Sequence, residues 1–224
     1  MKVTMITKDD LDENNYYRHC DSLDVDGSVE IGGNLGVVRF HGFLRAAGSI
    51  TARDGSEIEA GSGIKARSAI KAGSGIKAGG AIEAGAAIEA TSWIEAGAEI
   101  KAGWAIKAGA GIKAGAEIKA GEWIEAGGEI KAGEGIESGE WIEAGSAIEA
   151  GSEIKAGLQI SAKKTISAKL RIFAGICNWR NPFPEEMTIT AQRVEGEVGC
   201  GIVKLLAPEA SVNSDSSPQT ENKI

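Results

Sequence analysis

The chain has 224 residues, of which 32 are Gly and only 5% are aromatic, and its net charge is −8. A negative net charge argues against a general binder of nucleic acid or of anionic membranes. No apolar run approaches the ~18 residues of a membrane span. The first residues contain no secretory signal pattern, and three Cys are a sparse, odd number that suggests a reducing compartment. We therefore expect a cytoplasmic protein.

Residues 1–22 contain no repeat, and we expect them to form an N-terminal cap. After them come triplets in which an apolar residue, an outward residue and a second apolar or small residue follow one another. Most are spaced by six residues, with a longer step before the fourth. The triplets are Leu23-Asp-Val25, Val29-Glu-Ile31, Leu35-Gly-Val37, Leu44-Arg-Ala46 and Ile50-Thr-Ala52. Two extra residues around Asp54-Gly55 precede the regular repeat.

From Ile58 to Ile172 an Ile occupies every sixth position, 20 in all, in the unit I-[EK]-A-G-x-x. Six residues turn about 600° around an α-helix, so successive Ile would fall on three faces and form no apolar stripe. In an extended segment, Ile and the Ala two residues later point inward while Glu or Lys between them points outward. We expect the following Gly to supply positive φ at a corner. Repeated strands and corners predict a β-solenoid.

The charged residue after each Ile indicates the length of one coil. Between Glu59 and Lys155, 11 of 14 pairs at a spacing of eighteen residues have opposite charge, against 7 of 16 at a spacing of six. Opposite charges on neighbouring strands are favourable. Eighteen residues, or three hexapeptides, therefore predict a triangular coil, with ladders such as Glu59–Lys77–Glu95–Lys113 and Lys71–Glu89–Lys107–Glu125. The pattern does not choose a left- or a right-handed helix.

The repeat ends at Ile172, which makes residues 23–172 the predicted solenoid. Residues 173–207 are predicted to form a C-terminal cap, because Pro182 and Pro184 cannot donate to a strand ladder. A last, degenerate pair of strands is expected over Ile189–Val198. Residues 208–224 are polar, and we expect them to be disordered.

The repeat resembles two families of parallel β-helix. Its A-G-x-x-I-x phase is similar to the hexapeptide signature of left-handed β-helices, although bulky Ile stands where that signature has a small residue. The stretches LDVDGSVEIGGN and SITARDGSEIEAGSGIKA resemble the bactofilins. The first resemblance implies an acyltransferase with a His as general base, and the second implies a polymer-forming cytoskeletal protein.

The sequence predicts no catalytic, cofactor-binding or metal-binding residue. Its only two His, His19 and His41, lie in the irregular N-terminal region, where we interpret them as a cap and a loop residue. His19 and Cys20 have no second pair at the spacing of metal ligands. Cys177 and Cys200 could approach each other, and we expect them to remain thiols. The Glu residues have no partner that would prepare a carboxyl group for acid–base catalysis.

One stretch differs from the rest in charge and aromatic content. Residues 121–153 hold nine Glu against one Lys, whereas residues 155–171 hold five basic residues and no acid. GEWIEAG occurs twice, eighteen residues apart, so Trp123 and Trp141 should stack on adjacent coils. The predicted protein-binding site consists of Trp104, Glu122, Trp123, Glu140 and Trp141, because exposed Trp clusters are enriched in binding hot spots. The alternative is that these corners are only a product of repeat duplication.

The predicted function is that of a non-enzymatic scaffold that presents a rigid charged surface to a protein partner, which the Glu-rich stretch suggests is basic. Neither nucleic acid nor a membrane span is expected. A homo-oligomer or a bactofilin-like polymer of stacked coil ends remains open. Two alternatives stand beside it: an acidic inhibitor or nucleic-acid mimic, such as a phage anti-defence protein, and a hexapeptide-type acyltransferase.

Overall fold

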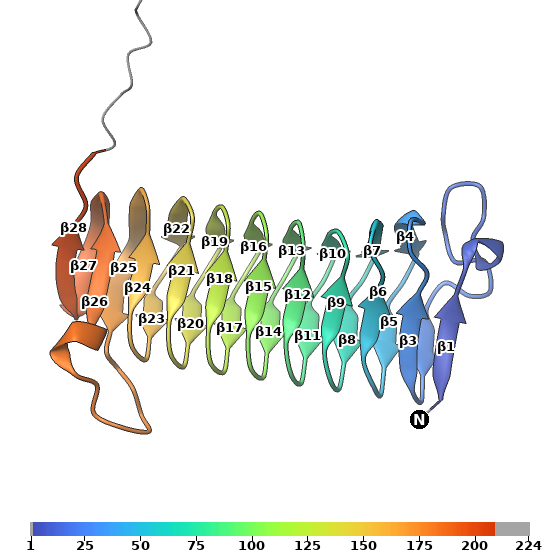
Figure 1. The fold of residues 1–224 in the computed structure, drawn as a ribbon, viewed down its shortest axis with the longest axis horizontal. Helices are drawn as coiled ribbons and strands as arrows, with labels where there is room; N and C mark the ends of the chain where they lie inside the picture. The colour runs from blue at the N-terminus through green and yellow to red at the C-terminus, as the bar shows by residue number, and fades with distance from the viewer. Residues whose placement is uncertain (1, 209–224) are drawn as a thin grey trace, which may run out of the picture.

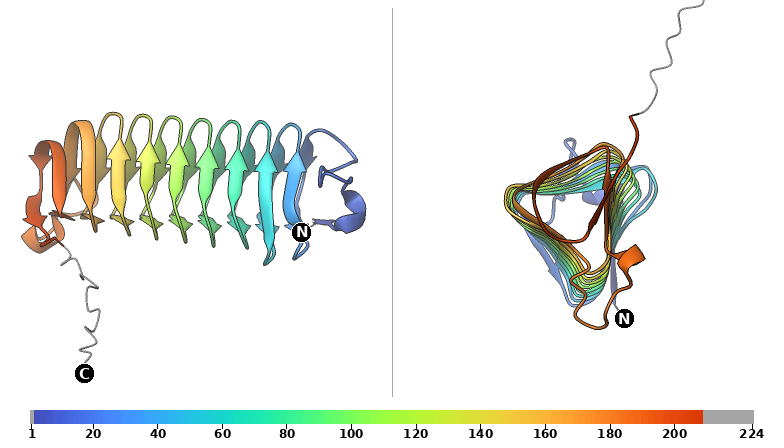
Figure 2. Two further views of the ribbon diagram at one scale, coloured as in Figure 1. Left: turned by 90° about the horizontal axis from the view of Figure 1, so that it is seen from above. Right: turned by 90° about the vertical axis from the view of Figure 1, so that its left-hand side faces the viewer.

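The computed structural model describes residues 2–208 as one elongated β-solenoid (Figure 1). The chain winds through about ten turns of ~18 residues, and its cross-section is triangular (Figure 2). The predicted fold class is therefore confirmed. The predicted solenoid of residues 23–172 contains the eight strands from β3 to β24 on one side of the triangle, and further strands extend the stack at both ends. Within the described residues no helix is long and apolar enough to cross a membrane.

The three sides of the triangle are called face 1, face 2 and face 3, and every strand pairs in parallel with the strand of the next coil. Face 1 contains β2 (Leu23–Val25), β5 (Leu44–Ala46), β8 (Ile64–Ala66), β11 (Ile82–Ala84), β14 (Ile100–Ala102), β17 (Ile118–Ala120), β20 (Ile136–Ser138), β23 (Ile154–Ala156) and the second half of β25 (Thr165–Ala174). Face 2 contains β1 (Val3–Ile6), β3 (Ser28–Ile31), β6 (Ile50–Ala52), β9 (Ile70–Ala72), β12 (Ile88–Ala90), β15 (Ile106–Ala108), β18 (Ile124–Ala126), β21 (Ile142–Ala144), β24 (Ile160–Ala162), β26 (Thr188–Ala191) and β28 (Ile202–Leu205). Face 3 contains β4 (Gly36–Phe40), β7 (Ser56–Ala60), β10 (Ile76–Ala78), β13 (Ile94–Ala96), β16 (Ile112–Ala114), β19 (Ile130–Ala132), β22 (Ala147–Ala150), the first half of β25, and β27 (Arg193–Cys200), which also pairs with the second half of β25.

The register confirms a coil of eighteen residues. Ile76 pairs with Ile94, and Ile94 pairs with Ile112, so the three lie in one interior column. All twenty Ile of the repeat are at most 1% exposed, and the residue two positions later, Ala in every case except Ser138, is buried with them. The core is therefore a narrow column of Ile and Ala that runs the length of the rod.

Both predicted charge ladders lie in register on the outer surface. Ion pairs join neighbouring coils in several rows, for example between Lys71 and Glu89 and between Lys107 and Glu125, each with an N–O distance of 3.0 Å. These side chains are about half exposed, so each pair contributes little on its own. Their main effect is to keep like charges off adjacent strands.

The repeat glycines serve a different purpose from the expected one. Positive φ occurs in the described chain only at Gly36, Gly55, Gly175, Gly196 and Gly201 among glycines, and none of these belongs to a regular A-G-x-x corner. A Cβ atom at Gly139, in contrast, would lie 2.0 Å from the carbonyl oxygen of Gly121 in the preceding coil. Most of these corner positions are glycine because their backbones stack closely, although Arg67, Thr91, Lys163 and Lys169 occupy the equivalent position in four hexapeptides.

The prediction that Leu35-Gly-Val37 forms an inward triplet is wrong. The buried residues of β4 are Val38 and Phe40. The extra residues of this coil precede the strand, where they form a wide corner over residues 32–36 that stacks on the insertion at Asp54-Gly55. The amide of Asn34 donates to the Asp54 carbonyl at 2.8 Å, and the buried Ser56 hydroxyl donates to the Gly32 carbonyl and accepts from the Leu35 amide.

The two ends of the solenoid differ. At the N-terminal end the 3-10 helix η1 (Lys8–Asp10) and the loop after it fold over the core, and Leu11 is buried there with Tyr17 packed against the core. At the C-terminal end β28, a strand that the sequence pattern does not predict, extends face 2, and its four residues are exposed. Apart from Pro208, the tail predicted to be disordered lies outside the described residues.

Candidate protein-binding edge

The predicted site residues lie on one edge of the triangular rod, at the corners where the chain passes from face 1 to face 2. The amide of Glu122 donates to the Trp104 carbonyl at 2.7 Å, and the amide of Glu140 donates to the Glu122 carbonyl at 2.6 Å. Trp104, Glu122 and Glu140 therefore form one column across three coils. Trp123 and Trp141 form the adjacent column, because each follows one of these Glu residues directly.

The aromatic rings of this edge are arranged in two ways. Trp123 and Trp141 stack face to face, with centroids 5.0 Å apart and an interplanar angle of 3°, and both are half-buried. The ammonium group of Lys107 lies 5.8 Å from the centroid of the Trp123 ring. Trp104 is 60% exposed. The stacked pair is a fixed apolar ridge, whereas Trp104 presents most of its surface to solvent.

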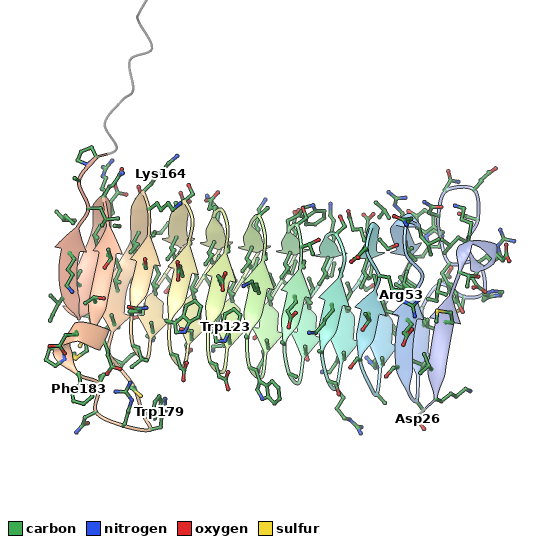
Figure 3. The ribbon with its side chains drawn as sticks, viewed as in Figure 1. Asp26, Arg53, Trp123, Lys164, Trp179 and Phe183 are labelled. Carbon is green, nitrogen blue, oxygen red and sulfur yellow. The ribbon has the colours of Figure 1, made fainter. Side chains whose placement is uncertain are left out.

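Sequence analysis missed two further aromatic residues of the same edge. The loop over residues 175–187, which includes the 3-10 helix η2 (Pro184–Glu186), connects face 1 to face 2 at the coil after Leu158. Trp179 and Phe183 on this loop are 58% and 68% exposed and lie on the same side of the rod as Trp123 (Figure 3). Four of the five Trp therefore belong to one edge. The sequence did indicate this position of the loop. Gly175, with which the loop begins, stands eighteen residues after the corner residue Gly157, and this spacing of one coil places both on the same edge.

The loop is held by a bidentate pair between Arg180 and Glu186, with two N–O distances of 2.6 Å. The amide of Phe183 also donates to Glu186 at 2.8 Å. These hydrogen bonds, that of Arg180 first, lower the pKa of Glu186 to about 2. The pKa of Arg180 is raised, chiefly by its hydrogen bond to Glu186, with a small contribution from the charge of Glu140. The loop thus places a guanidinium group near the Glu column.

The nine Glu of residues 121–153 are unequally neutralised. Five of them pair with Lys; these are Glu125, Glu129, Glu137, Glu149 and Glu153. Glu122, Glu134, Glu140 and Glu143 form no ion pair with another residue of the described chain. Two of these four, Glu122 and Glu140, lie in the same column as Trp104 and next to the column of Trp123 and Trp141. The aromatic edge therefore carries carboxylates that are available to a cationic group of another molecule.

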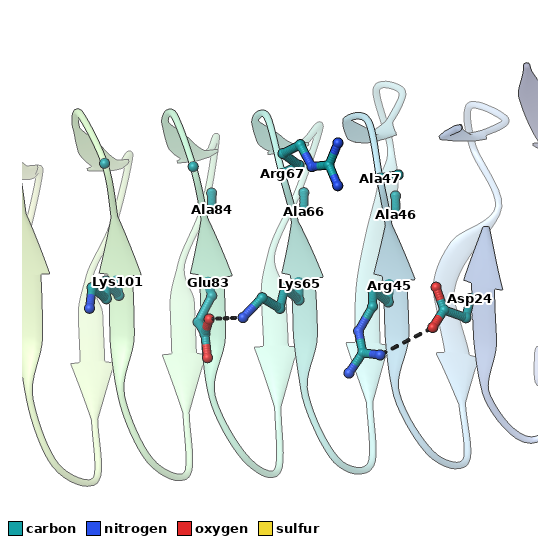
Figure 4. Close-up of a pocket in the computed structure, with 12 residues that line it drawn as sticks. Asp24, Arg45, Ala46, Ala47, Lys65, Ala66, Arg67, Glu83, Ala84 and Lys101 are labelled. Carbon is teal, nitrogen blue, oxygen red and sulfur yellow. Dashed lines mark hydrogen bonds and ion pairs between the residues drawn. The ribbon is translucent and has the colours of Figure 1, made fainter. Parts of the chain in front are cut away.

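A shallow groove occupies the N-terminal half of this edge, on its face 1 side, and ends at Gly103, the residue before Trp104 (Figure 4). Its volume is about 610 Å³. Arg45 pairs with Asp24, and Lys65 with Glu83, across its floor. Arg67 and Lys101 also line the groove and form no ion pair with any residue from 2 to 208. The edge is thus basic toward the N-terminus and acidic toward the C-terminus.

Of the other residues considered in the sequence, Cys177 belongs to the loop over residues 175–187 and the rest lie apart from this edge. His19 contacts Asp10 at 3.0 Å, and His41 stacks on Tyr16 with centroids 4.0 Å apart. Cys20, Cys177 and Cys200 are free thiols. Within residues 2–208, no three His, Cys, Asp or Glu side chains are grouped so that they could hold a metal ion.

Comparison with known proteins adds no relative: no protein-family model, curated protein or solved structure matches the chain.

Proposed function

We propose that this β-solenoid is a non-enzymatic cytoplasmic scaffold that binds a protein partner along its aromatic edge. The observation that carries the proposal is the collection of Trp104, Trp123, Trp141 and Trp179 on one edge of a rod whose other corners are mostly small residues. Trp is the residue most enriched in binding hot spots. The solenoid holds Trp104, Trp123 and Trp141 on backbone that is hydrogen-bonded between coils, so little conformational entropy is lost when these three rings bind a partner.

The charges of the edge favour a partner with a basic segment. The unpaired Glu122 and Glu140 flank the apolar ridge and would steer cationic side chains toward it, which makes association fast and salt-dependent. Apolar contact with the rings would then supply most of the affinity. The alternating Lys–Glu rows of the three faces disfavour the alternative of an acidic nucleic-acid mimic, which needs one sign of charge over a continuous surface.

The alternative of an acyltransferase has less support, because His19 and His41 both lie near the N-terminal end. Neither lines the groove of the aromatic edge.

The proposal is tested by affinity capture from cells of the organism that encodes the chain, with wild-type protein and the double variant Trp123→Ala, Trp141→Ala. A matched control replaces Glu99 and Glu134, which lie on the edge between face 3 and face 1, by Ala. We expect a protein captured by the wild type and the control to be lost with the Trp variant. The affinity of the captured protein for the Trp123→Ala, Trp141→Ala variant, measured calorimetrically, should be at least a hundredfold lower than for the wild type if both rings are hot spots. Equal capture by all three proteins contradicts the proposal.

Reversing the charge of the two Glu residues distinguishes electrostatic attraction of the partner from apolar contact with the Trp rings. Glu122→Lys with Glu140→Lys should slow association of the captured partner about tenfold at low salt, and the difference should shrink as salt is added. The same reversal at Glu99 and Glu134 serves as the control. An unchanged association rate would show that the partner is not basic at this edge.

A further inference from the structure

The last coil of the solenoid ends in an uncovered apolar surface. In β28, Val203 pairs with Ile189 and Leu205 with Ala191, both of which are fully buried. Val203 and Leu205 therefore continue the interior columns of face 2, yet they are 42% and 67% exposed. Ile202 and Leu206 beside them are also exposed. The core thus reaches solvent at this end.

The backbone of the same coil is equally open. β28 pairs only with β26, and β27 only with β25, within residues 2–208. The outer edges of both strands present amide and carbonyl groups without a strand partner in that range. An open edge of this kind is a template for further strand pairing. Both the apolar and the hydrogen-bonding surface of the coil are therefore incomplete.

The N-terminal end differs in that its apolar core is covered, although β1 pairs only with β3 and β2 only with β5 within residues 2–208 and both have an open edge. The chain after β1 crosses the core, where Leu11 is buried and forms an antiparallel bridge with Tyr17. The neighbouring Tyr16 bridges to Arg39 in β4 and so occupies the edge of face 3. Residues 7–22 carry five acidic and two basic side chains. An acidic, covered end does not complement an exposed apolar one, so head-to-tail stacking is disfavoured.

The nearest alternative cover is the chain's own tail, which follows Pro208 in the sequence. Of its sixteen residues, 209–224, only Ala210, Val212 and Ile224 are apolar, and Pro218 has no amide hydrogen to donate. A segment with so few apolar residues would cover the exposed Val203 and Leu205 side chains poorly, and its Pro would interrupt pairing with the edge of β28. A second copy of the same end supplies both an apolar surface and an unpaired edge of the same shape.

The geometry points to a tail-to-tail homodimer, in which the C-terminal coils of two copies abut and β28 of one lies antiparallel to β28 of the other. An isologous contact uses the same patch on both copies, and a two-fold axis that keeps both interior faces on the same side of the sheet is perpendicular to it, which makes the two strands antiparallel. At the N-terminal ends the covered core and the acidic loop over residues 7–22 leave no apolar surface for a third chain, so the assembly stops at two chains. This inference concerns a different surface from the aromatic edge and does not depend on it.

Two measurements on the full chain test the dimer. Light scattering should give twice the mass of one chain, and small-angle X-ray scattering should give a maximum dimension about twice that of a monomeric variant. The double variant Val203→Glu, Leu205→Glu should be a monomer. The matched control Val3→Glu, Met5→Glu, on outward positions of β1 with similar exposure, should remain a dimer. Circular dichroism checks that each variant is folded.

Cross-linking gives a test that needs no substitution. In a mixture of ¹⁴N- and ¹⁵N-labelled chains, an amine-reactive reagent should join Lys204 of one copy to Lys204 of the other, because every antiparallel register of a four-residue strand keeps them close. Links from Lys204 to Lys2 or Lys8 would instead indicate head-to-tail stacking and overturn the proposal.

Three other results would also overturn it. These are a monomeric wild type, a dimer whose maximum dimension equals that of one rod, and a Val203→Glu, Leu205→Glu variant that is folded and still dimeric. A chain truncated after Pro208 should be as dimeric as the full chain. If only the truncated chain dimerises, the tail covers the coil instead. The Trp123→Ala, Trp141→Ala variant should remain a dimer, which separates this result from the proposed function.

Discussion

Trp123 and Trp141 stand eighteen residues apart and stack with their rings almost parallel, 5.0 Å between centroids. Each ring is therefore held in part by the other. A stacked pair contributes about 0.5–1.5 kcal/mol beyond its buried area, so a double-mutant cycle with Trp123→Ala and Trp141→Ala should give a coupling energy near 1 kcal/mol. Urea denaturation measures it. Additive losses would show that the rings do not support each other in solution.

A charge in the middle of the core should be much worse than one near its end. Ile106 lies between Ile88 and Ile124, and Ile106→Asp places a carboxylate without a partner in an Ile and Ala column, at a cost of several kcal/mol. We expect this variant to be unfolded at room temperature. Ile50→Asp, close to the N-terminal end, should cost less, because terminal coils of a repeat protein are coupled to fewer neighbours.

Thermal melting followed by circular dichroism compares the two variants. Equal melting temperatures would contradict the interpretation of the core as one continuous, coupled column.

Ser138 is an exception within the inner columns, since it stands between Ala120 and Ala156 in face 1. Its hydroxyl is buried and has no hydrogen-bond partner among the described residues. Ser138→Ala removes this unsatisfied group and should stabilise the protein by about 1 kcal/mol. The measurement is the midpoint of urea denaturation. A lower midpoint would indicate that the hydroxyl has a partner in solution, such as a water molecule.

Two corner glycines, neither of which has a positive φ, should respond oppositely to a methyl group. At Gly139 a Cβ would lie 2.0 Å from the Gly121 carbonyl oxygen, whereas at Gly135 its nearest neighbour would be 3.5 Å away. Gly139→Ala should therefore destabilise the solenoid by about 1–3 kcal/mol through overpacking. Gly135→Ala should be neutral or stabilising by up to about 1 kcal/mol, because Ala has less freedom in the unfolded chain. Equal effects would contradict the stacking argument.

The loop over residues 175–187 should depend on pH through Glu186. Its pKa is lowered from 4.5 to about 2, chiefly by Arg180 and then by the Phe183 amide. A lowered pKa means that the ionised form stabilises the loop. This contribution is complete above about pH 4.5, declines as the pH falls, and is lost by about pH 2.

The carboxyl carbon shift of Glu186, followed by NMR, should titrate near pH 2. Glu186→Gln should increase the hydrogen exchange of the loop amides at neutral pH and leave those of β15 unchanged. A midpoint near 4.5 would show that the pair with Arg180 does not persist.

The regular part of the fold was predictable because its signal repeats. One Ile in six and alternating charges at a spacing of eighteen were enough to fix strands, corners and coil length. The irregular coils were not predictable in the same way, because Leu35 and Val38 are both apolar and only the hydrogen bonds of the wide corner decide which one points inward. The positions of Trp104, Trp123 and Trp141 on one edge followed from the eighteen-residue spacing of the coils. Trp179 lies in a longer loop in which that spacing is interrupted.

The wide corner at residues 32–36 and the insertion at Asp54-Gly55 have a further consequence for how the chain finds its fold. In the uniform middle of the rod, a strand displaced by one whole coil would meet the same Ile, Ala and Gly, so slippage by eighteen residues would carry a small penalty. The bonds from Asn34 to Asp54 and from Leu35 to Ser56 join segments that occur only once. These bonds can therefore form in only one register, and they fix the register of the coils that follow during folding.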